Sequence, residues 1–291
     1  MSDRGAEAVC VVGAGTMGVQ IALLAALAGH RVELVSRSAD RLDQAIAAGS
    51  ALLDRRVTRG RLSPAARDAA MALMHSGTDL AGAAGGADIV IESVVEDRDA
   101  KCRLFTELGL RAQSSALLTT NSSTLGSSLV AGCVPHPERL LNLHFFNPPL
   151  VMALVEVVRG PHTGDAAMDR AVGFAKGLGK TPVVVEREAY GFLANRMLFI
   201  AMLEAFRIVE AGHVAMDECD HAVSAALGWP LGPFRLADLV GLDVVEAILR
   251  EGQLQTGEAR WAPPAILLER VERGELGQKT GKGFYVHGSA A

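Results

Sequence analysis

The sequence predicts an α/β fold, in which a mostly parallel sheet forms the first domain and an all-helical C-terminal domain follows. Three observations predict this. Apolar runs typical of strands alternate with helix-period segments up to about Glu186, strand patterns are absent beyond it, and a glycine-rich turn joins the first strand to the first helix. The 291 residues are enough for two domains, and we place the boundary near Arg187–Ala189, between residues 1–187 and 188–291.

Strands and helices are expected to alternate in the first domain. The expected strands are Ala8–Val12, Arg31–Val35, Ala87–Glu92, Ala116–Thr120, Leu140–Phe145, Met152–Val158 and Pro182–Glu186. The helices expected between them are Thr16–Ala28, Arg41–Thr58, Pro64–Met74, Arg98–Arg111 and Asp165–Leu178. Those expected in the second domain are Tyr190–Ala211, Asp217–Ala226, Arg235–Arg250 and Pro263–Arg273, separated by glycine and proline.

One pair of strands should be antiparallel. Two strand patterns within Leu140–Val158 flank the breaker Asn147-Pro148-Pro149, which leaves no room for the crossover helix that parallel strands require. We therefore expect a hairpin-like addition to the parallel sheet.

Composition excludes several classes of function. The net charge of −5 and the pI near 5.9 give no basic field for nucleic acid or an anionic membrane. The apolar run Val19–Gly29 is too short to span a bilayer, and the N-terminus has no basic signal region. The four cysteines have no CxxC or Cys/His spacing, so we expect no disulfide framework, no metal site and a reducing cytoplasm.

The first glycine loop predicts a dinucleotide site. It follows an apolar strand and opens a helix, the context in which GxGxxG turns hold a pyrophosphate on free helix N–H groups. Gly13 would make the tight turn, Gly15 would let the backbone approach the phosphates, and Gly18 would let helix and strand pack closely. The expected binding residues are Gly13, Gly15, Thr16, Met17 and Gly18. We accordingly expect a Rossmann-type NAD(P)-binding domain.

The end of the second strand bears on the choice between NAD and NADP. An acidic residue there usually binds the adenine ribose, but this chain has Ser36 and Arg37, and Asp40 should lie too far along the next helix. Serine and arginine can bind a 2′-phosphate, so we expect NADP(H) to be used at least as well as NAD(H). The alternative is that Ser36 caps the next helix, Arg37 points to solvent and NAD remains the dominant cofactor.

His144 and Glu156 are candidates for a catalytic pair. The expected hairpin places them on adjacent strands, where a carboxylate can hold one imidazole nitrogen and leave the other free as a general base. Beside a nicotinamide, such a base would remove a hydroxyl proton while hydride leaves the same carbon. A core histidine that happens to face a glutamate is the alternative.

Several segments in one order resemble the L-3-hydroxyacyl-CoA dehydrogenase family, especially its 3-hydroxybutyryl-CoA dehydrogenase members. They are VCVVGAGTMG, IESVVEDRDAK, TTNSSTL, LHFFNPPLVMALVEVV, GFLANR, LGWPLGPFRLADLVGLD and GELGQKTGKGFY. The resemblance covers nearly the whole chain. It implies reversible oxidation of an L-3-hydroxyacyl-CoA thioester, an active site in the cleft between the domains, and a homodimer formed through the helical domain.

The resemblance also implies roles for individual residues. His144 and Glu156 would form the catalytic pair, and Ser123 and Asn195 would hydrogen-bond the reacting oxygen. Three further residues would bind near the nicotinamide ribose and the thioester, namely Glu96, Lys101 and Asn121. For Ser123 and Asn195 the alternatives are a helix-capping serine and a solvent-facing asparagine, although the apolar run around Asn195 favours burial.

The sequence departs from the family pattern at Tyr190, where proline is frequent, and at Ala153, where lysine is frequent. TTNSSTL also exchanges serine and threonine around Ser123. No catalytic group is lost, but the acyl substrate is left open.

A basic cluster ends the second expected helix and consists of Arg55, Arg56, Arg59 and Arg61. It is either a solvated helix end or a clamp, which would bind coenzyme A phosphates or an acidic carrier protein.

Three other functions also remain open. They are the same chemistry on a carrier-bound acyl group, oxidation of a free hydroxy or sugar acid, and dinucleotide binding without catalysis.

Overall fold

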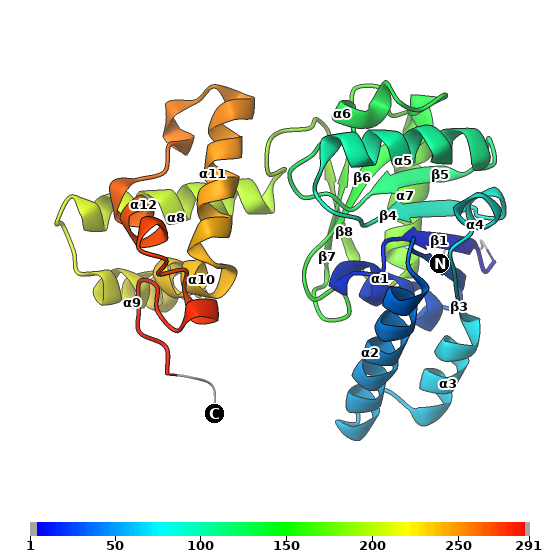
Figure 1. Cartoon of the computed structure of the whole chain (residues 1–291), viewed down its shortest axis with the longest axis horizontal. Helices are drawn as coiled ribbons and strands as arrows, with labels where there is room; N and C mark the ends of the chain where they lie inside the picture. The colour runs from blue at the N-terminus through cyan, green and yellow to red at the C-terminus, as the bar shows by residue number, and fades with distance from the viewer. Residues whose placement is uncertain (1–4, 289–291) are drawn as a thin grey trace. The chain divides into compact units, whose positions relative to one another are not determined.

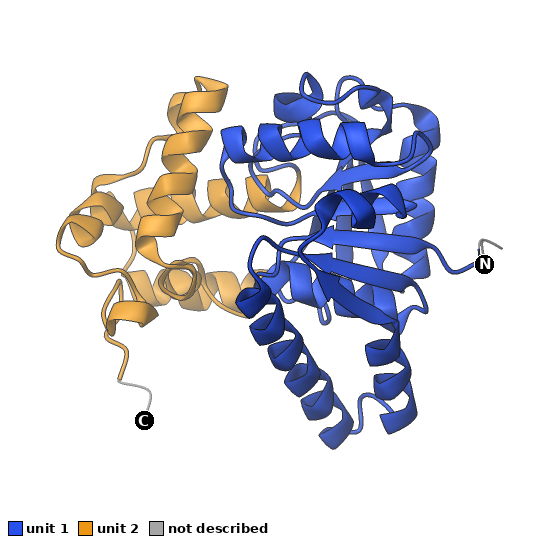
Figure 2. Cartoon of the chain, turned by 45° about the vertical axis from the view of Figure 1, so that its right-hand side comes forward, with its two compact units in different colours: residues 1–192 blue, residues 193–291 orange. Residues whose placement is uncertain are grey.

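The computed structural model describes residues 5–288. The chain divides into two compact units, residues 1–192 and 193–291 (Figure 2). The first unit is a sheet covered by helices and the second is helical, so the predicted fold class is confirmed.

One sheet of eight strands organises the first unit, in the order β3-β2-β1-β4-β5-β6-β7-β8 (Figure 1). The strands are β1 (Ala8–Val12), β2 (Arg31–Val35), β3 (Met74–Gly77), β4 (Ile89–Glu92), β5 (Leu117–Thr120), β6 (Leu140–Phe145), β7 (Leu154–Val158) and β8 (Thr181–Val185). Six of the seven neighbouring pairs are parallel, and β6 and β7 are antiparallel, as the Asn-Pro-Pro breaker predicts.

Helices cover both faces of this sheet, which is why β4 and β5 at its centre are buried over their whole length. They are α1 (Thr16–Leu27), α2 (Ala39–Thr58), α3 (Pro64–Leu73), α4 (Leu80–Gly85), α5 (Arg98–Arg111), α6 (Ser128–Ala131) and α7 (Asp165–Gly177). Alternate residues of β1 enter different cores. Val9 and Val11 belong to the cluster that includes residues of α1 and α7, whereas Cys10 and Val12 belong to the one that includes residues of α5 and α6.

The second unit is built from α8 (Ala194–Glu210), α9 (Met216–Leu227), α10 (Pro233–Val240), α11 (Leu242–Thr256) and α12 (Ala265–Glu272). Three phenylalanine rings, Phe206, Phe234 and Phe284, pack with centroids 4.8 to 5.1 Å apart. The buried carboxylate of Asp238 accepts hydrogen bonds from the backbone N–H groups of Phe284 and Tyr285 and pairs with the His287 ring. The end of the chain therefore closes the unit. No helix in the described part of the chain is long and apolar enough to cross a bilayer.

The short helices α4 and α6 were not predicted, and three other elements differ from prediction by more than a small shift of their ends. The helix expected over Arg235–Arg250 is two helices, because Gly241 has a φ of 101° and ends α10. The third expected helix stops at Leu73, and Met74–Gly77 forms an edge strand that its polar sequence did not predict. Helix α8 begins at Ala194 rather than Tyr190, because Gly191 and Phe192 both have positive φ.

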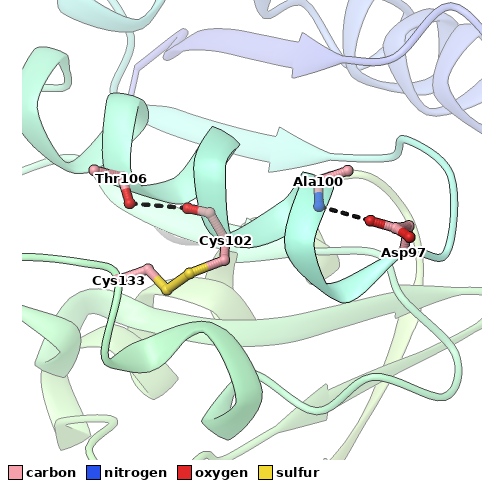
Figure 3. The surroundings of a disulfide bond; sticks show 5 residues. All are labelled: Asp97, Ala100, Cys102, Thr106 and Cys133. Carbon is pink, nitrogen blue, oxygen red and sulfur yellow. Dashed lines mark hydrogen bonds between the residues drawn. A yellow bond between two sulfur atoms is a disulfide. The ribbon is translucent and has the colours of Figure 1, made fainter.

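We expected no disulfide framework from the spacing of the cysteines, but two of the four are paired. Cys102 on α5 and Cys133 after α6 form a disulfide bond (Figure 3). Packing of α5 against α6 brings their Cα atoms to 5.6 Å, a separation that a disulfide can bridge. Because the two cysteines are 31 residues apart in the chain, no short-range spacing pattern announces the pair. Cys10 and Cys219 are free and buried.

We expect thiol counting to show this bond. The protein denatured without reductant should react with Ellman's reagent at two of its four cysteines, and at all four after reduction. A Cys102→Ser/Cys133→Ser variant should give two thiols under both conditions. Four reactive thiols in the unreduced wild type would contradict the bond.

Candidate active site

The first glycine loop has the geometry of a tight strand-to-helix turn. Gly13 has a φ of 122°, and its N–H donates to the Val35 carbonyl at 2.8 Å. A Cβ at Gly13 would overlap the backbone of Ser93, and one at Gly18 would overlap the Gly13 carbonyl. Only glycine fits at both positions, so β1, β4 and α1 approach one another closely.

Gly15 meets a different requirement. It is the N-cap of α1, no side chain caps this helix end, and nothing lies within 4 Å of the position that a Cβ would occupy. The first N–H groups of α1 are thus open to a ligand beside Thr16, which is exposed, and Met17, which is half-buried. An uncapped helix N-terminus with an open approach fits a dinucleotide pyrophosphate.

The structure at the end of β2 excludes the alternative that Ser36 caps the next helix. Helix α2 is capped by Ser38, whose hydroxyl accepts from the Arg41 N–H at 3.3 Å, so Ser36 is not the helix cap. Ser36 is half-buried, and Arg37 is exposed. Asp40 lies in the first turn of α2, as expected.

The β6–β7 pairing sets His144 directly opposite Glu156. Leu143 and Phe145 on β6, and Val155 and Val157 on β7, enter one core, so the alternation of side chains turns His144 and Glu156 to the other face. His144 Nδ1 lies 2.8 Å from Glu156 Oε2.

Both partners in this pair are buried, with 4% of His144 and none of Glu156 exposed. A carboxylate at Nδ1 selects the tautomer with hydrogen on that nitrogen and leaves Nε2 as a proton acceptor. Two phenyl rings flank the imidazole, with the centroid of Phe146 at 4.5 Å and that of Phe192 at 5.6 Å. The arrangement can act as an oriented general base.

A buried ion pair lies at the ends of β4 and β5. The Lys101 ammonium is 2.6 Å from Glu92 Oε1 and 3.4 Å from Glu96 Oε2. The other oxygen of Glu92 accepts from the Thr120 hydroxyl at 2.6 Å. Glu92 was not among the predicted site residues, although an acidic residue at the end of the apolar run ADIVIE is a signal that could have identified it.

Glu96 is held as an anion. Its carboxylate accepts hydrogen bonds from the hydroxyls of Ser122 and Thr124 and faces Lys101. Burial alone would raise the pKa of this carboxyl, but the Lys101 charge and the hydroxyl donors outweigh it and lower the pKa below its ordinary value. Glu96 and Lys101 therefore form one cluster, and it holds the loop that contains Ser123.

Asn121 and Ser123 lie on this loop after β5. Asn121 is buried, and its side-chain oxygen accepts from the Phe145 N–H at 2.9 Å, which ties the loop to the strand of His144. The Asn142 amide also donates to the Ser122 carbonyl at 3.3 Å. Ser123 is half-buried, and helix α6 begins only at Ser128, so Ser123 is not a helix cap.

Asn195 is the second residue of α8, and its side chain is half-buried. It belongs to the second unit, whereas His144, Glu156 and Ser123 belong to the first. The first unit thus contains every predicted catalytic residue except Asn195.

The basic cluster at the end of α2 has two kinds of member. Arg55, Arg59 and Arg61 are exposed, whereas Arg56 is half-buried and donates to the Leu150 carbonyl at 3.4 Å. Lys180 donates to two carbonyls of the same β6–β7 turn, and its pKa is lowered by burial and then by the Arg56 charge. Arg56 and Lys180 thus support the turn of the hairpin that carries His144.

Comparisons with known proteins match both units of the chain. The family model described as 3-hydroxyacyl-CoA dehydrogenase, NAD binding domain, matches residues 8–189, and the model of the C-terminal domain matches residues 191–287. A 3-hydroxybutyryl-CoA dehydrogenase of Mycobacterium tuberculosis is 40% identical over 99% of this chain and 100% of its own length. The human mitochondrial hydroxyacyl-coenzyme A dehydrogenase is 34% identical over 95% of this chain and 90% of its own length.

A solved structure is also similar over both units. The (S)-3-hydroxybutyryl-CoA dehydrogenase of Ralstonia eutropha superposes with a TM-score of 0.94 at 32% identity, covering 98% of this chain and all of that one. Both family models, the full-length relatives and the two-unit fold lead to one conclusion. The chain belongs to the 3-hydroxyacyl-CoA dehydrogenase family.

Proposed function

We propose that this protein interconverts L-3-hydroxyacyl-CoA and 3-oxoacyl-CoA by hydride transfer with a nicotinamide cofactor, using His144 as the general base. The observation that carries this proposal is the buried His144–Glu156 contact of 2.8 Å on a sheet that also bears a dinucleotide turn. Relatives named 3-hydroxybutyryl-CoA dehydrogenase support a short acyl chain as the first substrate to test.

In the oxidation direction, His144 Nε2 removes the proton of the 3-hydroxyl group. Glu156 holds the Nδ1 hydrogen and stabilises the imidazolium that forms, which lowers the barrier to proton removal. The hydroxyl of Ser123 and the amide of Asn195 donate to the reacting oxygen and orient it. In the reverse direction, the imidazolium returns the proton to the same oxygen.

The cofactor is assigned to the edge of the sheet where β1 and β4 end. The N–H groups at the start of α1 bind the phosphates, assisted by Gly13, Gly15, Thr16, Met17 and Gly18. Glu96, Lys101 and Asn121 line the nicotinamide end, where Glu96 accepts hydrogen bonds as an anion. When bound, the nicotinamide takes up or supplies the hydride.

For the adenosine end we propose NADP(H) use through Ser36 and Arg37. The absence of a carboxylate at the end of β2 removes the group that would repel a 2′-phosphate. The exposed guanidinium of Arg37 is free to turn toward an added phosphate. NAD(H) remains a second cofactor of the same site.

We assign cofactor binding to residues 1–187, and substrate binding and homodimer formation to residues 188–291. Large apolar side chains are exposed on the second unit, and a dimer contact there would remove some of them from water. They include Met197, Leu227, Leu239 and Leu254. Sedimentation equilibrium would test it, since a monomer mass would exclude the dimer. We also propose the cytoplasm as its location, which cell fractionation would test.

His144→Ala and Glu156→Gln should each cripple turnover. Loss of a positioned general base costs roughly 10²–10⁴ in rate, and cofactor binding measured by NADH or NADPH fluorescence should stay nearly unchanged. His162→Ala, which removes an exposed histidine, is the control and should keep the wild-type kcat. Wild-type turnover in His144→Ala would exclude the proposed base.

Acetoacetyl-CoA should be reduced far more efficiently than free acetoacetate. Binding energy from the coenzyme A handle can position the reacting carbon, and we expect it to raise kcat/KM by at least about 10²-fold. The measurement is oxidation of the reduced cofactor with each substrate. Equal efficiency would assign the protein to the free hydroxy acids, and activity only on an acyl carrier protein would assign it to carrier-bound substrates.

NADPH should support a kcat/KM at least equal to that of NADH with the same 3-oxoacyl thioester. Ser36→Asp should shift the ratio toward NADH by about tenfold or more, because the new carboxylate repels the 2′-phosphate. Ser38→Asp is the matched control, since it adds the same charge while aspartate can still cap α2, and its effect should be smaller. A wild-type preference for NADH of about tenfold or more would overturn the assignment.

A further inference from the structure

The backbone is strained where the first unit ends. Gly191 has a φ of 71° and Phe192 a φ of 49°, so two successive residues adopt the left-handed conformation. Glycine accepts this conformation without steric cost, but a phenylalanine does not, because its Cβ crowds the neighbouring carbonyl. Phe192 is one of two non-glycine residues with positive φ in the described chain.

Contacts on the preceding residues hold this segment in place. The Phe192 N–H donates to the Ala189 carbonyl at 2.8 Å, which closes a turn over Tyr190 and Gly191. One residue before the turn, the Glu188 carboxylate accepts from the Ser127 hydroxyl and from the Ser128 N–H at the start of α6. Strain of this kind persists only where the surroundings fix it, and it is concentrated at functional sites.

The strained residue directs its ring at the candidate base. The Phe192 side chain is 3% exposed, and its ring centroid lies 5.6 Å from that of His144 at an interplanar angle of 60°. This edge-to-face geometry is favourable for aromatic pairs. Glu156 fixes the imidazole at Nδ1, while Phe146 and Phe192 contact the ring itself.

We propose that Phe192 is a positioning residue for His144, and that the strained turn serves to press its ring against the imidazole. This inference rests on the proposed role of His144 as the base. A glycine at position 192 would relieve the strain but leave His144 without this contact, so the imidazole could rotate away from the reacting hydroxyl. The expected signature is a loss of kcat with little change in binding.

Phe192→Leu tests this, because leucine keeps apolar bulk but has no ring. Its kcat with acetoacetyl-CoA should fall roughly tenfold or more, while both KM values stay within about twofold, since small misplacements of catalytic groups are costly. The deuterium isotope effect with a 3-hydroxyacyl-CoA labelled at carbon 3 should rise as the chemical step becomes slower. Phe192→Tyr, which keeps a ring, should retain most of the wild-type kcat.

The matched control is Phe174→Leu. Phe174 is also buried in the first unit and packs against a histidine, with ring centroids 5.3 Å apart at His30. It should lose thermal stability comparably but keep kcat and the isotope effect. If Phe192→Leu does not fold, Phe192→Gly replaces it, because glycine is unstrained at this φ.

A folded Phe192→Leu or Phe192→Gly variant with wild-type kcat would overturn the proposal, as would equal losses of kcat in Phe192→Leu and Phe174→Leu. His144→Ala measured in parallel separates the two hypotheses. An active His144→Ala variant would remove the proposed base itself, whereas an inactive one beside a fully active Phe192→Leu would remove only the positioning role.

Discussion

The candidate site depends on the antiparallel pairing of β6 with β7. That pairing sets one buried carboxylate opposite one buried imidazole, and it is the only reversal of direction in a sheet that is otherwise parallel over the described residues. A shift of one residue in register would turn His144 into the aliphatic core and move Glu156 from its partner. The large side chains of Leu143, Phe145, Val155 and Val157 oppose such a shift, because they fill that core. Packing on one face of the hairpin therefore fixes the His144–Glu156 contact on the other.

Burial of charge recurs around this hairpin, and each buried charge has partners. Glu92 is fully buried, yet Lys101, Thr120 and the Val94 N–H all donate to it. An unpaired carboxylate at that position would cost several kcal/mol, so the ends of β4 and β5 and the start of α5 must be assembled together. Lys101 also forms an ion pair with Glu96, and the lowered pKa of Glu96 keeps this carboxylate charged at neutral pH. Glu92, Lys101 and Glu96 thus form a single electrostatic unit rather than a set of independent residues.

Local pattern predicted the parts of the molecule that depend on local constraints. The glycine turn, the alternation of strands and helices and the antiparallel hairpin follow from backbone sterics and from the side-chain period of each element. The contact between His144 and Glu156 also followed from the sequence, because the register of a hairpin determines which residues of its two strands lie opposite each other. The roles of Ser123, Asn195, Glu96, Lys101 and Asn121 came from the family resemblance and remain predictions.

Features that depend on distant contacts could not be predicted. The partners of Glu92 come from α5 and β5, the partner of Cys102 is 31 residues away, and β3 is a strand only because β2 offers it an edge. The break at Gly241 was missed because the apolar period continues through it. Phe192 was hidden for a related reason, since GFLANR continues an apolar helical pattern while its backbone turns the other way.

The carboxylate of Asp238 has a consequence for the order in which the two units can fold during synthesis. It is 1% exposed, and its hydrogen-bond partners Phe284, Tyr285 and His287 all lie near the end of the chain. Until residue 287 leaves the ribosome, this charge cannot be buried without losing its partners, so the second unit cannot complete its core. The sheet of the first unit does not depend on the second unit in this way, because all of its strands have been synthesised by residue 185. During translation, the sheet of the first unit can therefore form before the helical unit completes its core.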